Sequence, residues 1–383
     1  MWVFIFGIIL MIFLTPMLAV YSCIGLMYRP ANWRKYLPFF ILLIGIIAYS
    51  YKPLTSEDLV RYIEMLEQCR NMTLTEVFLY FNDSLFVKNV IFWGLSKLDE
   101  PHILPAISSA TVYGIAGYIT CDMAETWHCE KYIPLVLMWQ TLLLPFFSIT
   151  SNIRYVCAFS IIILAVYLEI EKKKRNILII ALYICPCFIH TTAWILVVLR
   201  LLVFLVDRFK LLPLLTVFSL PVLTNFLYQF KGKNWTKSNT INFIVNHTIV
   251  KAYWYLKGDD AEILINSGYQ RANRMVVLLL TIGFVILIIM LSREIKERSQ
   301  FMTYMFLICI VTLAFFSFQY PHYWRFAAAY AILIGVVLFP VLSIWDNVGI
   351  KKKCIVYFLG FLSLIEQILQ IWFSHYKVNY FEL

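Results

Sequence analysis

The sequence predicts an all-α integral membrane protein with about twelve transmembrane helices. Of its 383 residues, 62% are hydrophobic and only 14% are charged. A soluble domain of this length could not bury so much apolar surface, so lipid is expected to cover much of it. In addition, runs of about 15–22 apolar residues recur from end to end, separated by short polar or charged segments.

The apolar runs predict the individual spans, and the whole chain, residues 1–383, is expected to form a single transmembrane domain. The opening MWVFIFGIIL has no basic region and no small-residue cleavage site, so we expect it to remain as the first span. The predicted spans are residues 3–26, 37–51, 102–121, 132–149, 154–170, 176–189, 192–207, 211–228, 275–291, 301–318, 325–343 and 354–373.

The basic residues predict the orientation of these spans. The formal net charge is +10, and many of the positive charges lie in the short segments YRPANWRKY, EIEKKKR, DRFK, SREIKER and GIKKK. If every span crosses the membrane once, all five segments fall on the cytoplasmic side, which satisfies the positive-inside rule. Both termini then lie outside. The charge is therefore a topology signal, and no nucleic-acid partner is expected.

The segment 176–207 determines the orientation of everything after it. One continuous helix would be about 48 Å long, whereas two helices would each be about 21–24 Å long. A single span would move DRFK, SREIKER and GIKKK to the outside, so we predict a hairpin. His190 then lies at its outer tip, and Pro186 kinks the helix that leads into the tip.

Two large extracytoplasmic loops with short helices are expected, and the first covers residues 52–101. Ser56 is a candidate N-cap for a helix that carries Asp58, Arg61 and Tyr62 in its opening turns. These three side chains are neighbours at i, i+3 and i, i+4 spacing. They are candidate contacts for a substrate at the outer face.

The second large loop covers residues 229–274 and is rich in aromatic residues, amides and lysine. Trp235, Tyr253 and Trp254 are candidate sugar contacts, because sugars stack on aromatic faces and hydrogen-bond to amides. The alternative is an ordinary loop whose aromatic and basic residues lie among the lipid headgroups.

Three arginines share one kind of position, at or near the start of a helix that runs from outside to inside. They are Arg154, Arg274 and Arg325. A cation in the first turn opposes the helix dipole, so it is favourable mainly when an anion binds there. Backbone N–H groups and a guanidinium together suit a phosphate or pyrophosphate. The alternative is that each arginine pairs with a lipid headgroup.

Two histidines, His190 and His322, are expected in the same outer layer. An ionisable group within a membrane is a functional candidate, although a histidine at a helix tip can also be structural. A metal site is the weaker interpretation of ICPCFIHTTAWI, because Cys185 and Cys187 diverge on a helix and no acidic residue lies nearby. No metal or other cofactor is expected. The nine cysteines form no pattern of disulfides.

Residues Asn152 to Leu202 resemble the central signature of the EpsG/Wzy-type polysaccharide polymerases of bacteria. The segment is NIRYVCAFSIIILAVYLEIEKKKRNILIIALYICPCFIHTTAWILVVLRLL. As in that family, an arginine precedes a span with small residues, a short basic turn follows, and a second span closes on Phe-x-His. The resemblance extends to the layout of spans over most of the chain.

Two further elements of the family have counterparts here. Arg325 in HYWRFAAAY matches the late arginine that opens a C-terminal span. Asp58 and Tyr62 in EDLVRYIEML match the acidic and aromatic element of the first outer loop only loosely, because Leu59 follows the acid where the family has tyrosine.

The resemblance implies a glycosyltransferase of GT-C-like architecture in the bacterial inner membrane, with its active site facing the periplasm or cell exterior. It would join undecaprenyl-pyrophosphate-linked oligosaccharide repeat units into O-antigen, capsule or exopolysaccharide. The bilayer, the lipid-linked oligosaccharide and a chain-length regulator protein are the implied partners. His190 is the first candidate for the base and Asp58 the second.

The leaving pyrophosphate would be stabilised by arginines, first Arg154 and then Arg325, Arg274 and Arg271. Two alternatives stay open. An O-antigen ligase, or another glycosyltransferase acting on lipid-linked sugars, would use the same donor with another acceptor. A polysaccharide flippase or transporter would move the substrate without changing a bond. That class is less favoured, because the chain has only 13 glycines and no visible internal repeat.

Overall fold

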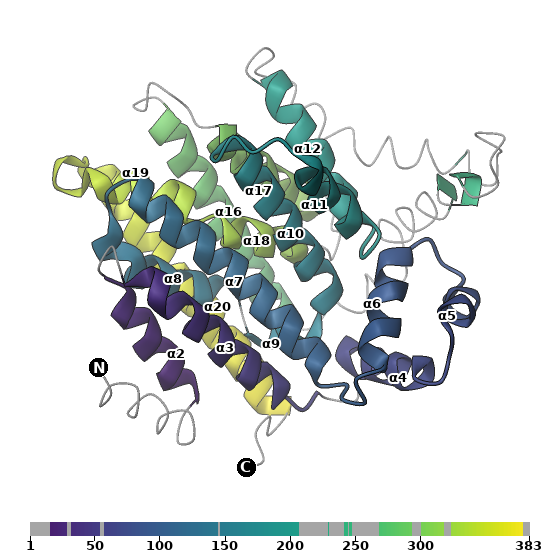
Figure 1. Cartoon of the computed structure of the whole chain (residues 1–383). Helices are drawn as coiled ribbons and strands as arrows, with labels where there is room; N and C mark the ends of the chain where they lie inside the picture. Colours follow the sequence, from purple (N-terminus) through teal and green to yellow (C-terminus); the bar gives the residue numbers. More distant parts are fainter. Residues whose placement is uncertain are drawn as a thin grey trace.

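The computed structural model describes residues 16–28, 32–53, 57–144, 146–206, 229, 241–243, 245–246, 268–292, 300–317 and 323–377. All regular structure within these ranges is helical, which confirms the predicted all-α class. Figure 1 shows the helices gathered into one bundle, with short helices at its lower right.

The helices follow the predicted apolar runs closely along the sequence. The α-helices are α2 (Pro16–Gly25), α3 (Trp33–Tyr49), α4 (Asp58–Cys69), α5 (Leu74–Phe81), α6 (Phe86–Ser96), α7 (Ile103–Thr126), α8 (Ile133–Leu143), α9 (Phe146–Ser151), α10 (Ile153–Ile170), α11 (Ile177–Cys187), α12 (Ala193–Val206), α16 (Gly268–Ser292), α17 (Gln300–Ser317), α18 (Tyr323–Ile332), α19 (Gly335–Ser343) and α20 (Ile350–Lys377). Short 3-10 turns are η1 (Leu26–Tyr28), η2 (Glu130–Tyr132) and η3 (Trp345–Asn347). The predicted span 211–228 and residues 3–15 of the predicted span 3–26 lie outside the described residues.

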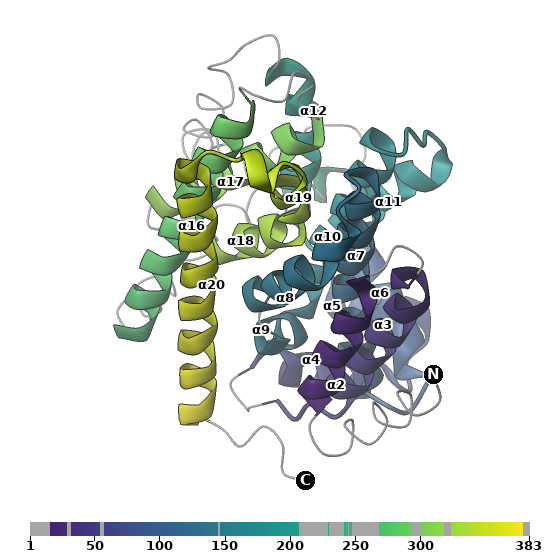
Figure 2. The same ribbon diagram turned by 90° about the vertical axis from the view of Figure 1, so that its left-hand side faces the viewer.

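Several helices are long and apolar enough to cross a bilayer. In the described ranges these are α7, α10 and the part of α16 from Ala272 to Ser292. The pair α18 and α19 gives a fourth candidate, bent by 42° at the break between the two helices. The long helix α20 lies along α16 at one side of the bundle (Figure 2). The total of twelve spans stays a prediction.

The predicted span 132–149 is wrong as a single helix. It is divided into α8 and α9, and Leu144 at the end of α8 has φ −111° and ψ 79°, outside the helical region. The following residue is Pro145, which lacks a backbone N–H and disfavours the helical conformation of the residue before it. The break was therefore visible in the sequence.

The segment 176–207 forms two helices, as predicted. α11 ends at Cys187, and the turn that follows holds His190 through a bond from its N–H to the carbonyl of Pro186 at 3.0 Å. The carbonyl of His190 in turn accepts the N–H of Ala193 at 3.0 Å, where α12 begins. Both helices pack against α10 (Figure 1).

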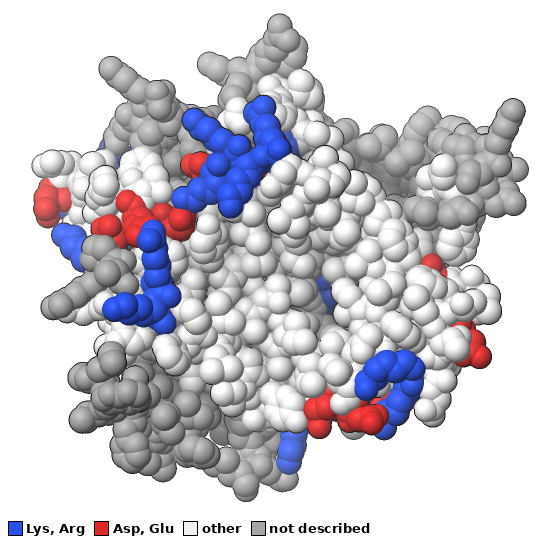
Figure 3. Space-filling view, in the orientation of Figure 1, with Lys and Arg blue, Asp and Glu red and all other residues white. Residues whose placement is uncertain are grey.

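Charged side chains gather at two opposite edges of the face drawn in Figure 3, and a wide band that is largely free of charge separates them. Near the C-terminal end of α7, Arg34 pairs with Glu125 at 2.8 Å, and Lys172 pairs with Asp122. Arg34 and Lys172 belong to two of the basic segments that were predicted to share one side of the membrane. Because each of them pairs with an acidic residue near the end of α7, the two basic segments lie at the same end of the bundle.

The first large loop forms a compact unit of its own. The helices α4, α5 and α6 pack together, and α6 reaches the tip of the α11–α12 hairpin (Figure 1). The N–H of Lys88 donates to the carbonyl of Phe188 at 3.2 Å, and the rings of Phe86 and Phe188 lie 4.1 Å apart. The loop is thereby fixed to the hairpin two residues before His190.

Candidate functional site

Arg154 occupies the first turn of α10 and meets a side chain from the first outer loop. Its guanidinium carbon lies over the ring of Tyr62 on α4, 4.7 Å from the ring centroid. Arg154 Nε is buried without a hydrogen-bond partner, and the side chain of Asn152 does not cap the helix. Within the described part of the chain, no carboxylate lies at ion-pair distance from Arg154. Among the described residues, the start of α10 therefore carries positive charge that no carboxylate pairs with directly.

Tyr155, the next residue along α10, joins three elements that are distant in sequence. Its ring centroid lies 6.1 Å from that of His190 at the hairpin tip and 5.2 Å from that of Trp324 at the start of α18. The guanidinium of Arg325 lies over the same ring, 5.3 Å from its centroid. Tyr155 thus brings His190 and Arg325 together, beside its sequence neighbour Arg154.

His190 is buried, with 6% of its surface exposed, although it lies in a turn. Its Nδ1 lies 2.7 Å from the hydroxyl of Thr192. The hydroxyl can donate to an unprotonated Nδ1 or accept from Nδ1–H. In the neutral ring, the first case puts the proton on Nε2 and the second leaves Nε2 as the basic nitrogen. Thr192 therefore orients the ring.

The first turn of α4 adds the remaining predicted residues of the outer loop. The helix begins at Asp58 with Glu57 as its N-cap, so the cap expected at Ser56 falls one residue too early, on a residue outside the described ranges. Asp58 and Arg61 form an ion pair at i, i+3 spacing. Asp58 lies within electrostatic range of both Tyr62 and Tyr155.

Tyr62 lies at the centre of these charges and is itself buried. Burial raises the pKa of its phenol above the ordinary value, and the nearby Arg154 cation opposes that rise. The phenol therefore stays neutral at physiological pH and can take part in hydrogen bonds without adding charge.

Arg274 lies beside the cluster and has a different environment. Its Nη2 donates to the carbonyl of Phe316 at 3.1 Å, and its guanidinium lies over the Phe316 ring at 4.5 Å. Phe316 is near the end of α17, where helix carbonyls lack partners within the helix, so Arg274 caps that end. The Phe316 ring contacts Tyr323 at 5.8 Å, which links Arg274 to the start of α18.

The side chains of five predicted site residues lie outside the described part of the structure. His322, Trp235, Tyr253 and Trp254 lie outside the described residues. Arg271 belongs to α16, but its side chain is outside the described part of the chain.

Tyr155 and Trp324, the two aromatic residues that hold the cluster together, were not among the predicted site residues. Each is a direct neighbour of a first-turn arginine, in the pairs Arg154-Tyr155 and Trp324-Arg325. That adjacency was the available signal, because an aromatic ring beside a buried guanidinium is a common way to stabilise it.

Two buried cations, Lys88 and Arg200, differ from Arg154 because they have carboxylate partners. Lys88 lies 2.5 Å from Asp83, and Arg200 lies 2.8 Å from Glu169. A buried cation with a carboxylate partner is neutralised locally and is expected to be structural. A cation held only by an aromatic face keeps its charge available for an anion.

The described residues include no group of three or more His, Cys, Asp and Glu side chains arranged to hold a metal ion. The two cysteines before His190 diverge, since Cys185 is exposed whereas Cys187 is buried. The Sγ of Cys187 donates to the carbonyl of Tyr183 within α11 at 3.3 Å. Cys187 therefore packs as an ordinary buried residue.

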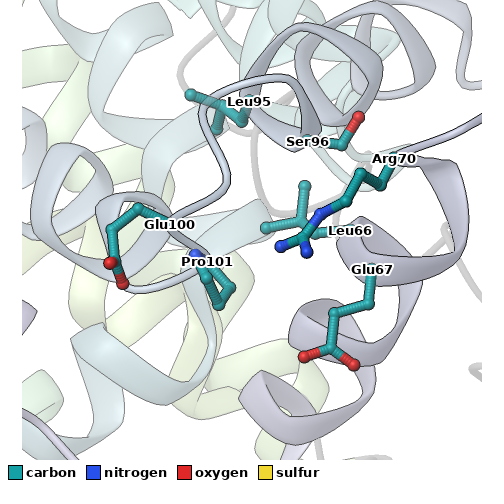
Figure 4. Close-up of a pocket in the computed structure, with 7 residues that line it drawn as sticks. All are labelled: Leu66, Glu67, Arg70, Leu95, Ser96, Glu100 and Pro101. Carbon is teal, nitrogen blue, oxygen red and sulfur yellow. The ribbon is translucent and has the colours of Figure 1, made fainter.

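A small hollow between α4, α6 and the turn before α7 is separate from the cluster (Figure 4). Its volume is about 10 Å³, enough for about one water molecule and far too small for a sugar. Arg70 extends across it toward Pro101, and the same arginine pairs with Asp99 at 2.9 Å. The residues that line it are Leu66, Glu67, Arg70, Leu95, Ser96, Glu100 and Pro101.

No protein-family model, curated protein or solved structure matches this chain. Its function is therefore inferred from the chemistry of the cluster and from the sequence pattern that led to it.

Proposed function

We propose that the protein is a glycosyltransferase of the bacterial inner membrane that polymerises undecaprenyl-pyrophosphate-linked oligosaccharide repeat units at the extracytoplasmic face. One observation carries the proposal. Arg154 lies in the first turn of α10 against the Tyr62 ring, and the next residue, Tyr155, contacts both His190 and Arg325. Positive charge, helix N–H groups and a titratable imidazole thus meet at one end of the bundle, as transfer from a lipid pyrophosphate requires.

The arginines would bind the pyrophosphate of the donor. As the bond between the anomeric carbon and the pyrophosphate oxygen breaks, that oxygen takes the electron pair and its negative charge grows. A guanidinium and uncapped helix N–H groups stabilise such charge without a metal. Arg154 is the first candidate because it lacks a carboxylate partner among the described residues, and Arg325 supplies a second cation over the Tyr155 ring.

His190 would accept the proton of the acceptor sugar hydroxyl. The hydroxyl oxygen attacks the anomeric carbon of the growing glycan, forms the glycosidic bond and releases its proton. If Nδ1–H donates to Thr192, Nε2 is the basic nitrogen and takes that proton. Asp58 is the second candidate, and its ion pair with Arg61 already engages its carboxylate.

The wider assignment belongs to the same proposal. It includes twelve spans, a GT-C-like architecture, and an orientation with the cluster outside and the basic segments inside. The apolar helices, the two charged ends of the molecule and the clustering of the predicted residues at one end support it. A lipid-linked repeat unit is the substrate, and a chain-length regulator is the proposed protein partner.

The decisive experiment incubates the purified full chain with undecaprenyl-pyrophosphate-linked repeat units in detergent. A ladder of longer lipid-linked glycans is expected from the parent protein and from Arg70→Ala, whose arginine pairs with Asp99 away from the cluster. Arg154→Ala is expected to form the ladder about 10²–10³-fold more slowly. If the folded parent makes no ladder, the polymerase proposal fails. Transfer only to an added lipid A core would then indicate a ligase, and movement of the substrate across vesicles without bond formation would indicate a flippase.

A further inference from the structure

Helix α6 has its polar and apolar faces reversed relative to a helix in water. The buried side of the helix carries Lys88, Asn89, Phe92 and Ser96. The exposed residues are Phe86, Val90, Ile91 and Gly94, with Phe86 41% exposed and Val90 44% exposed. A surface helix in water shows the opposite arrangement, and lysine is almost never buried unless it is paired.

The inward hydrogen-bond donors of α6 are paired within the protein, whereas the buried Oδ1 of Asn89 has no hydrogen-bond partner among the described residues. Lys88 Nζ donates to Asp83 at 2.5 Å and lies over the Phe81 ring at 4.1 Å. Asn89 Nδ2 donates to the other oxygen of Asp83 at 3.3 Å. Donors paired in this way need no water on the outer side of the helix, which is what a lipid environment demands.

The charge at the end of α6 is also turned toward the protein. Lys97 follows the last residue of the helix, and its Nζ donates to the carbonyls of Arg70 and Met72 at 2.5 and 2.9 Å. The indole of Trp93 donates to the same carbonyl of Met72 at 3.1 Å. The outer side of α6 itself thus presents only apolar groups.

This apolar side continues onto the α11–α12 hairpin. Phe86, the first residue of α6, stacks on Phe188 at the hairpin tip at 4.1 Å. The hairpin helix α11 exposes its own apolar residues, with Ile177 80% exposed and Ile180 52% exposed. A helix as apolar as α11 with such exposed side chains is expected to face acyl chains.

We propose that Phe86, Val90 and Ile91 of α6 form a lipid-docking surface that lies in the bilayer leaflet nearest His190. The first large loop is then not a solvated domain, because one of its helices is embedded beside the hairpin. The partner of this surface is phospholipid acyl chain. The proposal does not depend on the protein being a glycosyltransferase.

The test uses environment-sensitive labels on the full chain in vesicles of phosphatidylethanolamine and phosphatidylglycerol. A cysteine is introduced as Val90→Cys, or separately as Ile91→Cys, in a background with Cys185→Ser and Cys354→Ser, which removes the two exposed native thiols. Each is labelled with bimane. Ile180→Cys on α11 is the lipid control, and Glu64→Cys, exposed on α4, is the aqueous control. Labelling of the background alone is subtracted.

A nitroxide attached to the acyl chain is expected to quench bimane at position 90 or 91 as strongly as it quenches bimane at position 180. Aqueous iodide is expected not to quench bimane at positions 90 and 91. Bimane at 64 should show the reverse. Quenching by iodide at 90 and 91 equal to that at 64 would overturn the proposal. Protection from both quenchers, together with disulfide crosslinking between two copies of the unlabelled Val90→Cys variant, would overturn it as well and assign the surface to self-association.

Discussion

The guanidinium of Arg154 lies over the ring of Tyr62, with its central carbon 4.7 Å from the ring centroid. This contact joins the first outer loop to the start of α10, so the loop does not simply connect two helices. Cation–π contacts of this kind contribute about 0.5–2 kcal/mol. The ring stabilises the guanidinium without cancelling its charge, and this leaves Arg154 able to bind an anion.

Substitution of Arg154 is expected to reduce the rate of glycan transfer. Arg154→Ala should lower kcat by about 10²–10³-fold, the usual effect of removing one donor to a developing negative charge. Arg154→Lys keeps the charge but loses the planar fork, so an intermediate rate is expected. Initial rates of ladder formation give the measurement. Equal rates for Arg154→Ala and the parent would show that the leaving group binds elsewhere.

The role of His190 can be separated from that of a purely structural histidine through Thr192. If His190 is the base, His190→Gln should lower kcat by about 10²–10⁴-fold. Thr192→Val should lower it only roughly five- to tenfold, the equivalent of one hydrogen bond of about 1 kcal/mol. It should also change the acid limb of the pH–rate profile, because the tautomer balance of the ring shifts. Near-normal activity of His190→Gln would show that the histidine has only a structural role.

Much of the fold was predictable because hydropathy and helix formation are local properties. The helices α3, α7, α10, α11 and α12 follow apolar runs, and the break before α9 follows from Pro145. The meeting of Tyr62, Arg154, His190 and Arg325 was predicted only as a shared side of the membrane. Arg154 contacts Tyr62 directly, whereas His190 and Arg325 meet at the ring of Tyr155, and no local rule of sequence tells which ring fills such a space.

The pKa of Tyr62 provides a test of the cluster that does not require a substrate. Burial holds this pKa above the ordinary value of about 10. The contribution of Tyr62 to stability is therefore complete below the unfolded pKa and is lost as pH rises through the folded pKa. Because Arg154 lowers the pKa, Arg154→Gln is expected to raise it further.

Phenolate absorbance is followed as pH is raised in Arg154→Gln and in the double variant Arg154→Gln, Tyr62→Phe. The difference between the two titration curves isolates the phenol of Tyr62. The same difference in the Arg154 parent is the control. An equal or lower titration midpoint in Arg154→Gln would show that the guanidinium does not act on the phenol.

The last prediction concerns the ion pair that holds the hairpin to α10. Arg200 on α12 donates through Nε and Nη2 to the two oxygens of Glu169 on α10, at 2.9 and 2.8 Å. Tyr183 on α11 donates to the same carboxylate at 2.6 Å. One carboxylate therefore ties three helices together, and the far end of these helices carries Arg154 and His190.

Polar contacts matter here because lipid gives apolar helices no hydrophobic reason to associate. Arg200→Ala leaves the Glu169 carboxylate with only Tyr183 and should cost about 1–3 kcal/mol of stability. The double substitution Glu169→Gln, Arg200→Met removes both charges and should cost less than Arg200→Ala alone. Unfolding in a detergent titration measures the stability. The rate at which buried Cys187 reacts with a thiol reagent shows whether α11 has detached. Equal losses in the single and double variants would show that the pair acts through packing, since only an unpaired buried charge distinguishes them.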